Sequence, residues 1–189
     1  MKILAGKYKG RNIYMPAGIR PTQNMTRKAI FDILGHDLEG LAVLELFAGS
    51  GAVGLEALSL GAEATVFVER ESLAVETIQQ NLLLLGINSD AGARNRAQAE
   101  VIQGDAMAAI KQMAAAGRRF NVIFVDPPYE QGQAKKALKT LEGYDILQPN
   151  CIVIIEHSQR ETVPEENQRL AFITQRKYGN SLLTIFQAK

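Results

Sequence analysis

Four consecutive residues in the second half of the chain have the composition of a site for amino-group chemistry. They are Asp126, Pro127, Pro128 and Tyr129, and they follow the apolar run 121–125. The Asp126 carboxylate and the Pro127 carbonyl can each accept a hydrogen bond, the prolines offer no competing N–H group, and Tyr129 offers an aromatic face. This set suits a planar ring with an exocyclic NH₂ group, whose two N–H bonds would be accepted while the ring stacks on the tyrosine.

Such a site would activate a poor nucleophile. The lone pair of an aryl amine is delocalised into its ring, and accepting both N–H bonds biases the nitrogen toward a pyramidal geometry, with the lone pair aimed at an electrophilic methyl group. Asp126 would offset the positive charge that develops on the nitrogen and could accept the released proton. A strand-terminating turn is the competing interpretation, because aspartate and proline both form turns. The motifs upstream favour the site.

A glycine-rich motif follows an earlier apolar run and leads into a stretch rich in alanine and leucine. Its glycines are Gly49, Gly51 and Gly54, the spacing of a ligand-binding turn between a strand and a helix. We expect the first glycine to allow a tight turn, the second to let a ligand approach bare backbone, and the third to let the helix pack closely on its strand. Glu69 ends the next apolar run, where it could accept hydrogen bonds from a ribose diol. These features predict an adenosine-type cofactor without specifying which one.

The elements that would position these residues alternate along the chain, which indicates a parallel sheet covered on both faces. Strands are expected at 42–47, 64–68, 99–103, 121–125 and 151–155. Helices are expected at about 24–38, 52–60, 71–86, 105–116 and 132–142. Residues 2–14 predict a small hairpin, and the close spacing of 170–174 and 181–186 favours an antiparallel pair. We therefore predict an α/β fold with a mostly parallel, seven-stranded, Rossmann-like sheet and a C-terminal hairpin, as in class I methyltransferases.

Length and composition limit the organisation of the chain. Its 189 residues, 47% of them hydrophobic, fit one domain at 39–189 and a small extension at 1–38. No apolar run approaches the roughly 18–20 residues that span a bilayer, and the N-terminus lacks the apolar core of a signal peptide, so we expect a soluble, cytoplasmic protein. Cys151 is predicted to be a small buried side chain. His36 and His157 lie outside the motifs, so we expect structural or surface roles for them and no metal site.

The charge distribution is uneven although the net charge is only +1. Residues 1–31 contain seven basic groups and no acidic one, which leaves 14 basic and 20 acidic groups for 32–189. The seven are Lys2, Lys7, Lys9, Arg11, Arg20, Arg27 and Lys28. This end of the chain is either a docking surface for a polyanion or an ordinary solvated face.

The motifs together make the chain resemble the bacterial RsmD family of S-adenosylmethionine-dependent ribosomal RNA guanine-N2 methyltransferases. The resemblance runs nearly from end to end. It lies in Ile3–Arg11, Arg20–Thr22, Arg27, Phe31–Leu34, Leu44–Gly51, Leu55–Leu58, Phe67–Arg70, Asp126–Tyr129 and Tyr178–Gly179. The Asp-Pro-Pro-Tyr tetrad is shared by many amino-methyltransferases and so indicates the chemistry, whereas the basic N-terminal segment indicates the family.

The resemblance implies a role for each motif. S-adenosylmethionine would be held by Glu45, Phe47, Ala48, Gly49 and Gly51 at its methionine end, by Glu69 at its ribose, and by Gly104, Asp105 and Ala106 at its adenine. The guanine would be received by Asp126, Pro127, Pro128 and Tyr129. Ribosomal RNA, free or within a small ribosomal subunit, would be contacted by Lys7, Lys9, Arg11, Arg20, Thr22 and Arg27. We expect a monomer that requires no metal.

Other interpretations stay open at this point. Glu45 could instead be satisfied by backbone groups, and Asp105 could simply cap the helix that follows it. A nicotinamide-dependent oxidoreductase would share the glycine turn and Glu69 but would leave the tetrad without a function. A non-catalytic RNA-binding protein would explain the basic end but not the cofactor crevice. Among methyltransferases, the acceptor could also be adenine N6 in a nucleic acid or a protein glutamine amide, although the latter group more often has asparagine at the first tetrad position.

Overall fold

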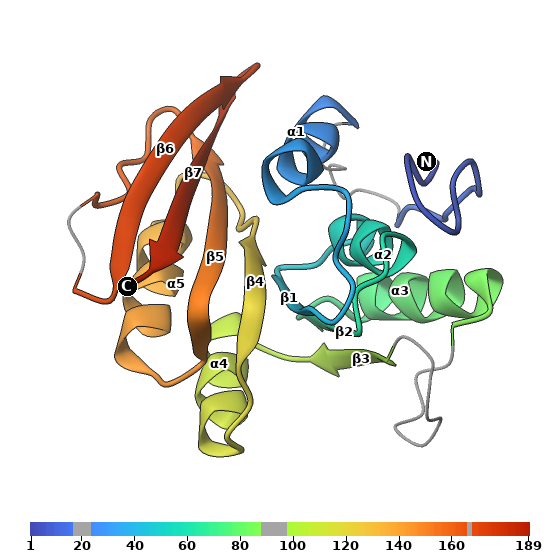
Figure 1. The fold of residues 1–189 in the computed structure, drawn as a ribbon, viewed down its shortest axis with the longest axis horizontal. Helices are drawn as coiled ribbons and strands as arrows, with labels where there is room; N and C mark the ends of the chain where they lie inside the picture. Colours follow the sequence, from blue (N-terminus) through green and yellow to red (C-terminus); the bar gives the residue numbers. More distant parts are fainter. Residues whose placement is uncertain (17–23, 88–97, 166–167) are drawn as a thin grey trace.

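The computed structural model describes residues 1–16, 24–87, 98–165 and 168–189, and its helices and strands alternate along most of the chain (Figure 1). The strands are β1 Ala42–Leu46, β2 Ala64–Glu69, β3 Gln98–Gln103, β4 Phe120–Val125, β5 Leu147–Ser158, β6 Leu170–Tyr178 and β7 Ser181–Ala188. The helices are α1 Asn24–Leu34, α2 Ala52–Ser59, α3 Ser72–Leu85, α4 Ala106–Ala115 and α5 Gln133–Gly143. In the part of the chain that the structure describes, no helix is long and apolar enough to cross a membrane.

The seven strands form one sheet in the order β3-β2-β1-β4-β5-β7-β6. The first five strands pair in parallel, whereas β7 runs antiparallel between β5 and β6. The chain enters the sheet at β1, moves outward to β3, and then returns to β4 on the other side of β1. The ends of β1 and β4 are therefore the switch point at which α/β sheets bind ligands. The predicted seven-stranded sheet with its C-terminal hairpin is confirmed.

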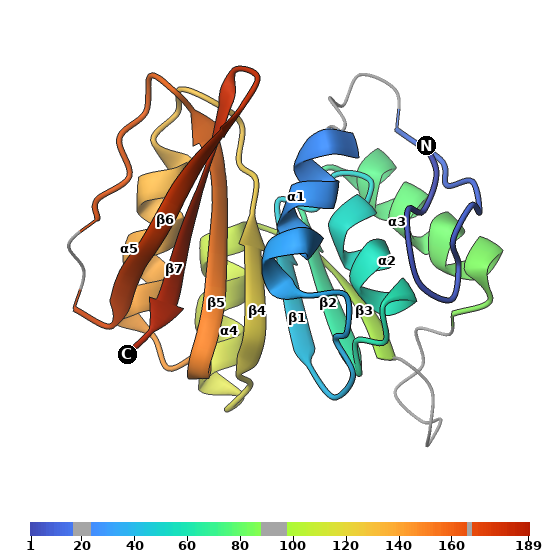
Figure 2. The same cartoon turned by 45° about the horizontal axis from the view of Figure 1, so that its top comes forward.

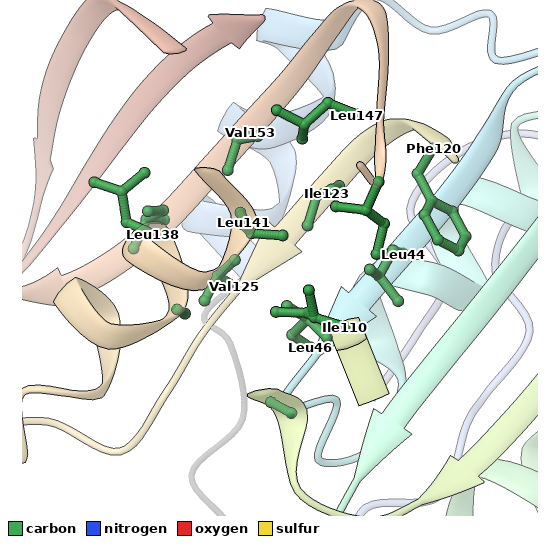
Figure 3. Close-up of a cluster of buried hydrophobic side chains, with 14 of the residues drawn as sticks. Leu44, Leu46, Ile110, Phe120, Ile123, Val125, Leu138, Leu141, Leu147 and Val153 are labelled. Carbon is green, nitrogen blue, oxygen red and sulfur yellow. The ribbon is translucent and has the colours of Figure 1, made fainter. Parts of the chain in front are cut away.

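Helices cover both faces of this sheet, with α1, α2 and α3 on one face and α4 and α5 on the other (Figure 2). Successive strand residues point to opposite faces, so each strand contributes to both layers of the core. Leu44 of β1 and Ile123 of β4 pack with Ile110 and the rest of the cluster beneath α4 and α5 (Figure 3). Their neighbours Val43 and Val122 pack with α1 and α2 instead. Burial on both faces holds the strand ends rigidly beside one another.

One buried carboxylate fastens the N-terminal segment to α2. Glu56 accepts hydrogen bonds from the N–H groups of Leu4 and Ala5 at 2.7–3.0 Å, and its Oε2 lies 3.4 Å from Nε of Arg27 on α1. Arg27 also donates to the Lys2 carbonyl at 2.6 Å, and its side chain is 0% exposed. The prediction that Arg27 contacts RNA is therefore wrong. Its guanidinium ties α1, α2 and the N-terminal segment together inside the protein.

The predicted N-terminal hairpin is a bridged loop without regular strands. Lys2 and Asn12 form an isolated antiparallel bridge. The turn between them contains Gly6, whose φ is +76° and whose position leaves no room for a side chain. A Cβ atom there would lie 1.9 Å from the Ser59 carbonyl oxygen at the end of α2. The segment is thus pressed against α2 at a point where only glycine fits.

The other predicted elements are confirmed, with differences at their ends. Helix α1 ends at Leu34 rather than near residue 38, because Gly35 has a φ of +84°, a conformation that terminates helices. Strand β5 is longer than the predicted 151–155, because β7 pairs with it as far as Ser158. This extension carries Glu156 to the same edge of the sheet as the ends of β1 and β4.

Candidate active site

A cavity of about 470 Å³ opens at the carboxyl ends of the parallel strands. Its volume is within the usual range for small-molecule sites, roughly 300–1,000 Å³. The lining residues are Glu45, Phe47, Ala48, Gly49, Ser50, Val68, Glu69, Arg70, Glu71, Gly104, Asp105, Ala106, Phe124, Asp126, Pro127, Pro128, Tyr129, Gln131, Gln133 and Glu156. The structure thus brings both predicted motifs, separated by more than seventy residues in sequence, to one continuous site.

The turn after β1 has the backbone conformation that its glycines predict. Gly49 and Gly51 have positive φ values of 55° and 73°. Phe47, which lines the cavity, also has a positive φ of 59°. Such a conformation is uncommon for a side chain of this size and is typical of functional turns. The turn therefore presents Phe47, Ala48 and Gly49 toward the cavity at a local conformational cost.

The other two glycines of the motif serve packing. A Cβ at Gly54 would lie 2.3 Å from the Phe67 ring and 2.8 Å from Oε2 of Glu45, which confirms the predicted close packing of α2 on the sheet. Gly51 is buried, does not line the cavity, and would bring a Cβ within 3.1 Å of Phe67 and Ile78. The structure therefore gives no support to a ligand contact at the backbone of Gly51, which stays a prediction. Glycine is required there by the positive φ and by these neighbours.

Glu45 reaches the cavity from the interior of the sheet. Its two carboxyl oxygens accept hydrogen bonds from the N–H groups of Val53 and Gly54, at 3.2 and 2.8 Å, in the first turn of α2. Burial raises the pKa of this carboxyl to about 8, although the two backbone donors act in the opposite direction. The interpretation that Glu45 satisfies backbone groups is confirmed. It also lines the cavity, and its contact with a cofactor stays a prediction.

Glu69 is held by three backbone donors. Its Oε2 accepts from the N–H of Gly49 at 2.7 Å, and its Oε1 accepts from the N–H groups of Arg70 and Glu71 at 2.7 and 2.9 Å. The residue is 9% exposed and lines the cavity. A carboxylate offers about four lone-pair sites, so acceptor capacity remains for a ligand hydroxyl. The contact with Gly49 also couples the end of β2 to the glycine turn.

Asp105 marks the third strand end at the cavity. Its Oδ1 accepts from the N–H of Ala108 at 3.0 Å, which makes it the N-cap of α4, as one of the two interpretations predicts. The preceding Gly104 donates its N–H to the Glu69 carbonyl at 2.8 Å. Gly104, Asp105 and Ala106 therefore form one wall of the cavity beside Glu69.

The Asp-Pro-Pro-Tyr tetrad forms the opposite wall. Asp126 follows the last paired residue of β4, and its N–H donates to the Leu46 carbonyl of β1 at 3.4 Å. The Tyr129 hydroxyl donates to Oε1 of Glu156 at 2.9 Å and lies 2.6 Å from Oγ of Ser181. Burial, with the nearby negative charges of Glu156 and Asp126, raises the pKa of Tyr129 to about 12. The phenol therefore keeps its proton and acts as a fixed donor at neutral pH.

Glu156 is the site residue that the sequence reasoning missed. It is 5% exposed, lines the cavity, and accepts the Tyr129 hydroxyl through Oε1. Its Oε2 is buried without a hydrogen-bond partner among the described residues. A signal for it existed in the sequence, because Glu156 directly follows the apolar run 151–155, just as Glu69 and Asp126 follow theirs. An acidic residue directly after a strand of a parallel sheet is placed at the ligand-binding edge.

The predicted RNA-contacting residues lie away from the cavity or outside the described residues. The exposed ones in the N-terminal segment are Lys7, Lys9 and Arg11. The N–H of Lys7 donates to the Ser59 carbonyl at 2.7 Å, at the end of α2 that faces away from the cavity. Eight helical residues, about 12 Å, separate this end from the glycine turn. Arg20 and Thr22 lie outside the described residues.

Cysteine and histidine have the structural roles predicted for them. Cys151 is buried, and burial raises the pKa of its thiol to about 12. His157 is 0% exposed and lies 2.8 Å from the Thr184 hydroxyl, while His36 is exposed beside Asp32. Within residues 1–16, 24–87, 98–165 and 168–189, no cluster of acidic, cysteine or histidine side chains could hold a metal ion.

The fold and this site together define a class I methyltransferase: seven strands in this order, a glycine turn after β1 and an Asp-Pro-Pro-Tyr tetrad after β4 that face one cavity. A protein-family model described as "Conserved hypothetical protein 95" matches residues 1–187. The chain belongs to this family, the RsmD family that its sequence resembles.

Individual relatives are similar over nearly the whole chain. YlbH of Bacillus subtilis, named as a candidate rRNA methyltransferase, is 32% identical over 191 residues that cover 100% of both chains. Ribosomal RNA small subunit methyltransferase D of Haemophilus influenzae is 30% identical over 90% of this chain and 86% of its own. Among solved structures, the candidate methyltransferase yhhF of Escherichia coli superposes with a TM-score of 0.82 at 28% identity, covering 100% of this chain and 98% of that one.

Proposed function

We propose that this protein transfers a methyl group from S-adenosylmethionine to the exocyclic N2 amino group of a guanine in small-subunit ribosomal RNA. The observation that carries the proposal is the single cavity in which the glycine turn and Glu69 face the Asp-Pro-Pro-Tyr tetrad. Either motif alone could serve another function. Together they provide for a nucleoside-type cofactor and for an amino group in reach of it.

The first wall, which we call the cofactor half, consists of Glu45, Glu69 and Asp105 with the turn Phe47–Gly49. Its residues fit S-adenosylmethionine by their chemistry. Glu69 offers acceptor sites for the two ribose hydroxyls, while Asp105 lies beside it to accept from the adenine amino group. Glu45, at the buried end of the turn, would accept from the ammonium of the methionine part. A cation there favours the ionised form of a carboxyl whose pKa burial raises to about 8.

The second wall, which we call the base half, consists of the tetrad and Glu156. S-adenosylmethionine supplies an electrophilic methyl group when it is bound. Asp126 and the Pro127 carbonyl accept the two N–H bonds of the guanine amino group, Asp126 balances the charge that develops on nitrogen, and the same carboxylate takes the released proton. Tyr129, fixed by Glu156 and Ser181, stacks on the base. Holding the nitrogen in line with the methyl group supplies much of the acceleration.

Ribosomal RNA as the substrate is supported by the relatives, because the Haemophilus influenzae protein is named as a methyltransferase of the small-subunit RNA. A base that is stacked within a helix cannot reach a cavity at the end of a sheet. The target nucleotide must therefore be unpaired or flipped out of its stack. The exposed Lys7, Lys9 and Arg11 would contact phosphates beyond the target nucleotide.

The test is to incubate the purified protein with methyl-labelled S-adenosylmethionine and small-subunit ribosomal RNA, free or assembled into subunits, from a bacterium that lacks its own enzyme of this family. Mass spectrometry of the nucleosides should find the label in N2-methylguanosine. Label in N6-methyladenosine, or in no nucleoside, would contradict the proposal.

A matched pair of variants controls this experiment. Asp126→Asn should strongly slow transfer, because its amide can neither balance the developing charge nor take the proton. Asp145→Asn should not change the rate, because Asp145 is an exposed carboxylate that pairs with Arg119 and Arg169 on the surface. Calorimetric titration should show binding of S-adenosylmethionine and of its demethylated product and no binding of nicotinamide dinucleotides. Tight binding of the latter alone would favour an oxidoreductase.

A further inference from the structure

Glu156 has an acceptor atom that the mechanism above does not use. The residue is 5% exposed and lines the cavity, and its Oε1 accepts the Tyr129 hydroxyl at 2.9 Å. Its Oε2 is buried and has no hydrogen-bond partner among the described residues. Leaving a buried acceptor without a donor is costly, and more so for a carboxylate. A ligand that brings an N–H group to Oε2 would remove this cost.

Orienting Tyr129 does not by itself explain a carboxylate at this position. The phenol has one proton, which one acceptor atom satisfies, and Ser181 lies 2.6 Å from the same hydroxyl. A serine or an amide at position 156 could accept the tyrosine proton without burying a second charged oxygen. The presence of glutamate therefore points to a second donor, which none of the described residues supplies.

The position of Glu156 indicates where that donor lies. Val125 of β4 pairs with Ile155 of β5 in parallel register, and Asp126 and Glu156 are the next residues of the two strands. Neighbouring strands lie about 4.8 Å apart. The two carboxylates therefore stand side by side at the cavity, and both contribute to the negative potential at Tyr129. They can accept hydrogen bonds from two adjacent donors on one ring.

We propose that Glu156 reads the guanine base by accepting the N1–H group, while Asp126 and the Pro127 carbonyl accept the neighbouring N2 hydrogens. Guanine presents N1–H and N2–H₂ side by side on its Watson–Crick edge. Adenine presents a lone pair at N1, which would face the carboxylate of Glu156 without a proton between them. The pocket would thus select guanine over adenine through the residue next to the reacting group. This inference rests on the proposed function.

The experiment compares guanine with 2-aminopurine at the target nucleotide. 2-Aminopurine keeps the exocyclic 2-amino group but has a lone pair at N1 in place of N1–H. Small-subunit ribosomal RNA that carries either base at the mapped position can be prepared by splinted ligation, assembled into subunits, and methylated with labelled S-adenosylmethionine. We expect kcat/KM to be at least about 100-fold lower for 2-aminopurine, because a site built to bind a donor rejects an analogue that lacks it.

The variant Glu156→Gln sharpens the comparison. Its carboxamide can accept the Tyr129 proton through oxygen and donate through nitrogen to the N1 lone pair of 2-aminopurine. The preference for guanine should therefore shrink to about tenfold or less. If Glu156 only orients Tyr129, the variant would slow both substrates equally and the ratio would persist. Ser181→Ala, which removes the other partner of the tyrosine hydroxyl, should leave the ratio unchanged.

The outcomes separate the two proposals. If the parent protein methylates no guanine, the proposed function fails. If it methylates guanine and 2-aminopurine equally, or if Glu156→Gln keeps the full preference, the role of Glu156 is refuted while the function stands. The comparison of the two bases with the parent protein needs no variant, so a variant that fails to fold does not prevent the test.

Discussion

Carboxylates line both halves of the cavity, but the two halves hold them with different groups. In the cofactor half, Glu45, Glu69 and Asp105 accept hydrogen bonds from backbone N–H groups of the turns and helices that follow their strands. In the base half, Glu156 accepts from the Tyr129 side chain and keeps one buried oxygen without a partner among the described residues. In the first arrangement each carboxylate is already oriented by backbone donors, whereas in the second one carboxylate oxygen has no donor among the described residues.

This difference agrees with the proposed division of the cavity between a cofactor and a base. Backbone donors fix the orientation of a carboxylate firmly, because they belong to the turns and helix ends that directly follow the strands. They suit a cofactor that must bind in one pose. Side-chain partners leave acceptor capacity for a base that arrives with its own donors. Variants that change kcat without changing the Kd for S-adenosylmethionine, or the reverse, test this division.

The largest expected effect is that of Asp126→Ala on turnover. Removing the acceptor at the reacting nitrogen should lower kcat on the order of 10²–10³-fold, by analogy with removed oxyanion donors. The Kd for S-adenosylmethionine should change little, because the cofactor half stays intact. Single-turnover methylation and calorimetry would measure the two quantities on the same preparation. Normal turnover by this variant would disprove the mechanism.

The reciprocal variant, Glu69→Ala, should act on binding first. It removes a charged acceptor with three backbone donors and should raise the Kd for S-adenosylmethionine about 10- to 100-fold, as expected for a hydrogen bond to a charged group. At saturating cofactor, kcat should recover toward the parent value. A variant with unchanged Kd and a lower kcat would place Glu69 in the chemical step and erase the division between the halves. Glu76→Ala, which removes an exposed carboxylate of α3 outside the cavity, is the control.

Glu45, in the cofactor half, should make the stability of the folded protein depend on pH. Its pKa rises from 4.5 to about 8 on folding, so the folded protein binds this proton more tightly than the unfolded chain does. Its stabilising contribution is therefore complete below pH 4.5 and is lost as the pH rises through 8. We expect the free energy of unfolding of Glu45→Gln, measured with urea, to rise relative to that of the parent by on the order of 2 kcal/mol between pH 5.5 and 8.5. A difference between Glu45→Gln and the parent that does not change with pH would refute the shift.

The smallest expected effect concerns RNA docking and should leave both halves unchanged. Replacing Lys7, Lys9 and Arg11 by alanine should flatten the dependence of RNA affinity on salt, by about 0.7 in the log–log slope for each lost phosphate contact on a single strand. Filter binding over a salt series would measure it. The matched control replaces three exposed lysines of α5, Lys135, Lys136 and Lys139. Equal slopes for both triple variants and the parent would mean that the N-terminal segment is only a solvated face.

The sequence predicted most of the cofactor half because its contacts are local. Gly49, Gly51 and Gly54 follow one strand, and Gly54 is only nine residues from the Glu45 carboxylate that it accommodates. The periodicity and spacing of residue types indicate such short-range contacts directly. The same holds for the alternation of strands and helices, from which the order of the sheet follows by simple rules of connection.

The failures lie where contacts join distant parts of the chain. We predicted from the cluster of basic residues that Arg27 contacts RNA at the surface. Nothing in the neighbouring sequence reveals that Glu56 lies 3.4 Å from it in the fold. Likewise, Tyr129 and Glu156 are 27 residues apart and meet only because β4 and β5 are neighbours in the sheet. The position of Glu156 after an apolar run was visible in the sequence, but its hydrogen-bond partner was not.

The central claim, that the cavity is divided between cofactor and base, is tested most directly by a crystal structure of the protein with S-adenosylhomocysteine, the demethylated product. We predict that the ribose hydroxyls lie on Glu69 and the amino-acid end beside Glu45 and the glycine turn, with the space in front of Asp126 and Glu156 left open. A ligand that binds across Asp126 and Glu156 would contradict the account.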